Sequence, residues 1–142
     1  MRERWLLLPT AAYVAALALI GLWATPVDQN VAVAQLPLVE WMAGLLDLTV
    51  PQSYKAVEVA ANVALFIPLG ALVLLWWPRW SWVHAAVIAF ASSLAIETLQ
   101  AIVRPERFAT LSDLVANTAG GAIGGLLTVG GRELVRRRRR RR

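Results

Sequence analysis

Long runs of apolar residues, separated by short polar links, dominate the pattern along this chain. Four runs are long enough to cross a hydrocarbon layer of roughly 30 Å as helices. They cover about residues 6–24, 57–77, 82–103 and 111–130. The pattern therefore predicts a single-domain, all-α integral membrane protein over residues 1–142, built as a bundle of four transmembrane helices.

The stretch 31–50 is apolar overall but carries a polar stripe. From Pro37 the apolar side chains recur at helical spacing, with Glu40, Gly44 and Asp47 on the opposite face. A helix at about 37–48, lying on the outer membrane interface between the first and second spans, fits this pattern. The alternative is a fifth span, which would place the two chain ends on opposite sides of the membrane.

Positive charge sets the expected orientation of the four spans. With the N-terminus inside, eleven arginines fall on the inner side, namely Arg2, Arg4, Arg79, Arg132 and the run 136–142. Three basic residues, Lys55, Arg104 and Arg107, fall outside. Because cytoplasmic loops of membrane proteins carry the excess of Lys and Arg, we expect both termini in the cytoplasm.

Composition narrows the classes of function. Apolar residues make up 58% of the chain, and the formal net charge is +5. Removing the seven arginines 136–142 changes that charge to −2, and no basic surface with interleaved aromatic residues is left for a nucleic acid. The arginine-rich segment 132–142 is better explained as a cytoplasmic anchor on anionic lipid. With no cysteine and a single histidine, His84, we expect no disulfide, metal site or cofactor.

Polar side chains inside or beside the predicted spans are the candidate chemistry, because such groups are costly in a membrane and often functional. In the four-span topology they lie within roughly 10 Å of the outer interface. Glu97 and Gln100 share one helix face, as do Asp113 and Asn117. We expect an outward-facing polar pocket formed by Asn62, Glu97, Gln100, Arg107, Asp113 and Asn117.

A packing role for the same side chains is the competing interpretation. Asp113 could cap the start of its helix, and Asn62 and Asn117 could hydrogen-bond between helices. Small residues recur every four positions in the last span and favour close helix packing, within one chain or in a homo-oligomer through this glycine-rich helix. These helix-packing residues are Ala116, Gly120, Gly121, Gly124 and Gly125.

Three ordered motifs carry a family resemblance. They are N-x-x-L-F-x-P-L-G from Asn62 to Gly70, E-x-x-Q from Glu97 to Gln100, and Arg107 followed by D-x-x-x-N-T-x-G from Asp113 to Gly120. The chain thereby resembles the VanZ-like family of small bacterial membrane proteins. The resemblance implies a helical, multi-pass protein of the bacterial cytoplasmic membrane, and its founding member is associated with resistance to the glycopeptide antibiotic teicoplanin.

Three hypotheses for function follow. The first is a non-enzymatic envelope protein whose pocket binds membrane lipid, a lipid-linked cell-wall intermediate or a lipoglycopeptide, and so changes teicoplanin susceptibility. The second is a membrane enzyme that acts on a lipid-linked or phosphorylated envelope substrate, with Glu97 and Asp113 as acid–base groups. The third is a module in which the polar residues only fix the packing of the helices.

Overall fold

The computed structural model describes residues 4–21, 37–103 and 111–141, which form helices and no strand. The helices are α1 (Arg4–Gly21), α2 (Pro37–Leu46), α3 (Val50–Trp76), α4 (Trp82–Val103) and α5 (Leu111–Arg140). By length and composition, α1, α3, α4 and α5 can each cross a membrane. The expected all-α architecture with four candidate spans is therefore confirmed.

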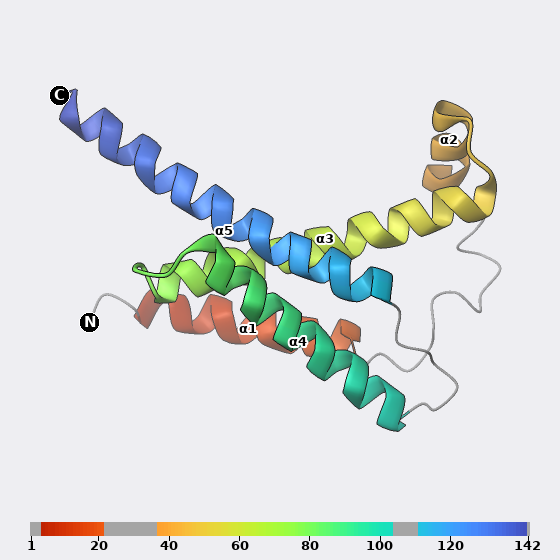
Figure 1. The fold of residues 1–142 in the computed structure, drawn as a ribbon, viewed down its shortest axis with the longest axis horizontal. Coiled ribbons are helices and arrows are strands. Elements are labelled where there is room, and N and C mark those ends of the chain that lie inside the picture. The colour runs from red at the N-terminus through yellow and green to blue at the C-terminus, as the bar shows by residue number, and fades with distance from the viewer. Residues whose placement is uncertain (1–3, 22–36, 104–110, 142) are drawn as a thin grey trace.

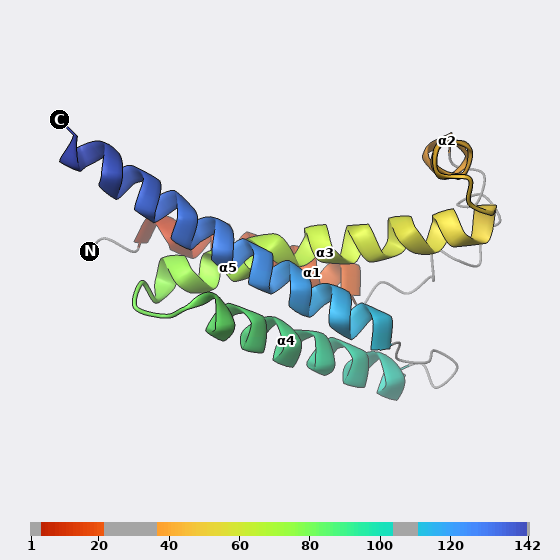
Figure 2. The same ribbon diagram turned by 45° about the horizontal axis from the view of Figure 1, so that its top comes forward.

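The long helices form a bundle in which α5 lies along both α3 and α4 (Figures 1 and 2). Helix α1 packs more loosely on α3 and α4. Two hydrogen bonds tie it to α3: Trp76 Nε1 donates to Thr10 Oγ1 at 2.9 Å, and the Tyr13 hydroxyl donates to the Leu65 carbonyl at 2.8 Å. The start of α1 and the end of α5 lie at the same end of the bundle, as an even number of crossings requires (Figure 1).

The core is small, and large apolar side chains cover much of the outside. Buried apolar residues gather where α1, α3 and α4 meet, around Phe66 and Ala89, and further along α3 around Leu74. In contrast Leu8 is 81% exposed, Ile102 72% and Val115 68%. An outer surface of this kind would be a liability in water and suits contact with lipid chains.

Two stripes of small residues explain how closely α5 approaches its neighbours. An added Cβ at Gly120 would lie 2.3 Å from the Val63 carbonyl oxygen of α3, and one at Gly124 would lie 1.9 Å from the Ile67 carbonyl oxygen. Gly121 and Gly125 face α4 instead, next to Ala89 and Trp82 respectively, while Ala116 is buried. All five small residues are thus covered by helices of the same chain.

Arg132 of α5 contacts the C-terminal end of α3. The Arg132 guanidinium donates to the Leu74 carbonyl and, at 3.2 Å, to the Pro78 carbonyl. Trp77 and Trp80 stack in the turn that follows α3, with ring centroids 4.8 Å apart. Arg132 therefore lies level with a group of tryptophans, which favour the membrane–water interface.

The helices extend beyond the predicted spans. α3 begins at Val50, before the predicted residue 57, and α5 continues past residue 130 to Arg140. α1 is described to Gly21, so the predicted residues 22–24 lie outside the described ranges. α2, predicted over 37–48, ends at Leu46 and stands beside the start of α3, steeply inclined to it (Figure 1); its place relative to a membrane stays a prediction.

Candidate functional site: a polar cluster at one end of the bundle

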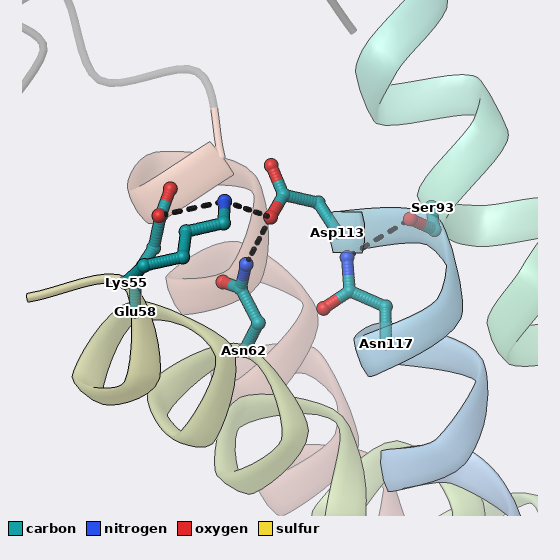
Figure 3. A network of polar contacts seen from close by, with 6 residues as sticks. All are labelled: Lys55, Glu58, Asn62, Ser93, Asp113 and Asn117. Carbon is teal, nitrogen blue, oxygen red and sulfur yellow. Dashed lines mark hydrogen bonds and ion pairs between the residues drawn. The ribbon is translucent and has the colours of Figure 1, made fainter. Parts of the chain in front are cut away.

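The first turns of α3 and α5 bring a group of polar side chains together (Figure 3). Asn62 Nδ2 donates to Asp113 Oδ1 at 3.0 Å, and Lys55 Nζ lies 3.9 Å from the same oxygen. Lys55 also forms an ion pair with Glu58 at 2.8 Å. We call these four residues the Asp113 cluster.

Helix geometry puts the α3 members of the Asp113 cluster on one face. Lys55, Glu58 and Asn62 are spaced i, i+3 and i+7, so they form a stripe along two turns. That stripe exists because α3 begins at Val50, where the Thr49 N–H donates to Gln52 Oε1 at 2.9 Å and closes the helix start. Lys55 therefore joins the cluster because α3 begins before the predicted span.

The cluster is graded from an exposed rim to a buried base. The side chains of Lys55, Glu58 and Asp113 are 46%, 30% and 21% exposed, respectively. One turn after Asp113, Asn117 is only 8% exposed and donates through Nδ2 to Ser93 Oγ of α4 at 2.9 Å. Asn117 Oδ1 has no hydrogen-bond partner among the described residues. Polar groups thus continue inward from the rim, between α3, α4 and α5.

The α5 pair divides between two neighbours. Asp113 contacts α3 through Asn62 and Lys55, whereas Asn117 contacts α4 through Ser93. Helical spacing placed Asp113 and Asn117 on one face of α5, and that face meets two different helices. The reason is that α5 lies in the groove between two helices, so adjacent positions on its inner side face different partners.

The α4 residues of the predicted pocket lie on the same part of the bundle but engage differently. The Gln100 side-chain amide donates to the carbonyl of Gly21, the last described residue of α1. Glu97 is half-buried, one turn after Ser93 on α4. Arg107, the expected counter-ion, lies in the segment 104–110, outside the described residues. The structure thus brings Asn62 to Asp113, and the pocket of all six residues stays a prediction.

Three residues of this region were missed by the sequence analysis. Lys55 was treated as part of an outer loop, and Glu58 and Ser93 were not considered. Helical spacing contained the signal, since Lys55 and Glu58 precede Asn62 by seven and four residues and Ser93 precedes Glu97 by four. The charge of Lys55 was taken to lie before the start of the helix at residue 57, and Glu58, inside the predicted span, was overlooked.

The chemistry available at the Asp113 cluster is electrostatic. It holds two carboxylates and one ammonium group, all partly exposed, with an amide donor fixing one carboxylate oxygen. A hydrogen bond between helices of a membrane protein contributes about 0.6 kcal/mol on average, and a partly exposed ion pair contributes about 1 kcal/mol or less. Within the described ranges, no group of three or more His, Cys, Asp or Glu side chains is placed to hold a metal ion.

Comparison with known families settles what kind of protein carries this arrangement. Residues 8–134 match the model of the VanZ/LLP1 family. The chain belongs to the VanZ/LLP1 family. The match contains every member of the Asp113 cluster and ends before the arginine run. No curated protein and no solved structure matches the chain.

Family membership and the four apolar helices agree with one another. The chain is a VanZ-like, multi-pass membrane protein built as a helix bundle. The VanZ-like resemblance drawn from the three sequence motifs is thereby confirmed.

Proposed function

We propose that this VanZ-like protein is a non-enzymatic protein of the bacterial cell envelope. The Asp113 cluster would bind the head group of a membrane lipid or of a lipid-linked cell-wall intermediate at the outer leaflet, and so change susceptibility to teicoplanin. The observation that carries the proposal is the partly exposed Lys55–Asp113 pair, 3.9 Å apart at the end of the bundle opposite the arginines.

The geometry of that pair favours binding. A contact of 3.9 Å is loose for an ion pair, so a phosphate or ammonium group of a ligand can compete for either partner at small cost. The exposed rim gives access to such a group, and Asp113 is already held in place by the hydrogen bond from Asn62 and by Lys55. Binding therefore explains the cluster with fewer assumptions than acid–base catalysis.

A packing role is the second candidate, and it too has a specific observation behind it. The Asn62–Asp113 and Asn117–Ser93 hydrogen bonds each join two helices. Polar contacts of this kind stabilise helix pairs in membranes by about 0.6 kcal/mol on average. Lys55 separates the two candidates, because its side chain is 46% exposed and contributes little to packing.

The test is the teicoplanin tolerance of bacteria that express the protein and its variants. We expect Lys55→Gln and Asp113→Asn to reduce tolerance to the level of cells without the protein, at unchanged protein abundance. Lys55→Arg, which keeps the charge, should retain tolerance, and Glu133→Gln at the opposite end of α5 is the matched control.

The other outcomes contradict the proposal in different ways. Unchanged tolerance in every strain would remove the link to teicoplanin. Loss of tolerance in proportion to protein abundance, strongest for Asn117→Ala and absent for Lys55→Gln, would establish the packing role. Turnover of envelope lipids by the purified protein would establish the enzyme hypothesis.

A further inference from the structure

The end of α5 forms a second charged feature, unrelated to the Asp113 cluster. The helix continues without a break to Arg140, and the side chains of residues 136–140 are exposed all round it. The family match ends at residue 134. The arginine segment therefore lies outside the matched residues.

Among the described residues, few acidic side chains lie near the arginines at the end of α5. In the described part of the chain, the ion pairs of this segment both fall on Glu133, with Arg136 Nε at 2.8 Å and Arg137 Nε at 2.9 Å. The hydrogen bonds from Arg137 and Arg136 hold the pKa of Glu133 below its usual range. One carboxylate cannot neutralise five helical arginines, and like charges at i, i+3 and i, i+4 repel one another.

The contact between Arg132 and α3 fixes the height at which the arginine helix begins. Arg132 donates to the Pro78 carbonyl, beside the stacked pair Trp77 and Trp80. Because a helix rises about 1.5 Å per residue, Arg136 lies about 6 Å and Arg140 about 12 Å beyond that level. Each head-group layer is roughly 5–8 Å thick, so long arginine side chains from this segment reach the phosphate groups.

We propose that the helical segment Arg136–Arg140 is a binding surface for anionic phospholipid in the leaflet at the C-terminal end of α5. Lipid phosphates would supply negative charge beyond the single carboxylate of Glu133 that the described residues place beside these arginines, and Arg binds phosphate with paired donors. Each arginine near an anionic lipid surface strengthens the binding of the segment to that surface by about fivefold. A nucleic acid is the less suitable partner, since the segment has no aromatic side chain on which bases could stack.

The experiment uses the full chain in lipid nanodiscs. Because the protein contains no cysteine, Arg141→Cys provides a single site for a spin label at the end of the helix. Nanodiscs contain phosphatidylcholine alone or with about one-quarter phosphatidylglycerol. We expect phosphatidylglycerol to slow the label and raised salt to reverse the effect, because screening weakens such contacts. In a variant with Arg136–Arg140 replaced by Gln, this lipid response should be lost.

Two controls keep the result interpretable. Replacing the same five residues by Lys should retain most of the response if charge is what binds, and Arg79→Gln, in the turn before α4, should leave it unchanged. Equal label mobility in both lipids would overturn the proposal. Slowing by an added oligonucleotide, with no effect of phosphatidylglycerol, would overturn it in favour of a nucleic acid. Neither result bears on the Asp113 cluster, which lies at the other end of the bundle.

Discussion

At the scale of single residues, the Arg132 side chain replaces a backbone hydrogen-bond donor that is missing at Pro78. In a continuing helix the Leu74 carbonyl would accept from the N–H of residue 78, but that residue is proline and has no N–H. The Arg132 guanidinium donates to the Leu74 carbonyl instead, and also to the carbonyl of Pro78. The side chain thus joins the end of α3 to α5 and satisfies groups that a helix end leaves unpaired.

We therefore expect Arg132→Met to destabilise the bundle although Arg132 lies near the surface. Leaving a partly buried carbonyl unpaired costs about 1–3 kcal/mol. Because a loss of that size lowers the unfolding midpoint of a protein domain by several degrees, we expect a shift of about that size for thermal unfolding in detergent. Arg138→Met, an exposed arginine of the same helix, is the matched control and should leave the midpoint unchanged. Equal effects of the two substitutions would show that the Arg132 contacts contribute no stability.

The contacts of individual polar residues were only partly predictable. Helical spacing and topology placed Asn62 and Asp113 near each other, and they form a hydrogen bond. The partner Lys55 was missed, because a charge next to an apolar run looks like the end of a helix. Which neighbour each side chain of α5 would face depends on the packing of three helices, and spacing along one helix cannot determine it.

At the scale of elements, the glycines of α5 set how the helices meet. Gly120 and Gly124 lie on the α3 side, and the Cβ of any larger residue there would overlap a carbonyl of α3. Gly70 of α3 meets the Gly121 carbonyl in the same way, at 1.9 Å from an added Cβ. Because these contacts are between backbones, rotating a side chain cannot relieve the overlap. The helices themselves would have to separate.

Gly124→Ala should therefore destabilise the protein although alanine is the better helix former. Overpacking of this kind costs about 1–3 kcal/mol or more. Gly130→Ala is the matched control: it lies in the same helix with nothing within 4 Å of the added Cβ, so it should stabilise by up to roughly 1 kcal/mol through helix propensity. Thermal unfolding in detergent measures both. The same sign for the two substitutions would contradict the close packing of α3 and α5.

Helices were easier to predict than their ends. Apolar length identified the candidate spans α1, α3, α4 and α5, because a run of about 20 apolar residues has few other uses. Hydropathy does not report where a helix stops once it leaves the apolar layer. The first turns of α3 and the arginine end of α5 were therefore not expected to be helical, and both carry charged groups that matter to the proposals.

At the scale of the whole molecule, the two ends of the bundle have opposite character. One end carries the Asp113 cluster, where α3 and α5 begin and α2 lies beside α3 (Figure 1). The other carries the tryptophan turn, Arg132 and the arginine segment. Since cytoplasmic ends of membrane proteins are the more positive ones, this polarity predicts that the Asp113 cluster faces the outside of the cell. The proposed binding of an outer-leaflet head group depends on that orientation.

Thiol labelling in intact cells tests this orientation directly. The protein has no cysteine, so Val50→Cys, exposed at the start of α3, and Arg138→Cys each report one end without background. A membrane-impermeant maleimide added to intact cells should label the protein with Val50→Cys, and should label the one with Arg138→Cys only after the membrane is permeabilised. Labelling at position 138 in intact cells, with position 50 protected, would place the Asp113 cluster in the cytoplasm and contradict the proposed function.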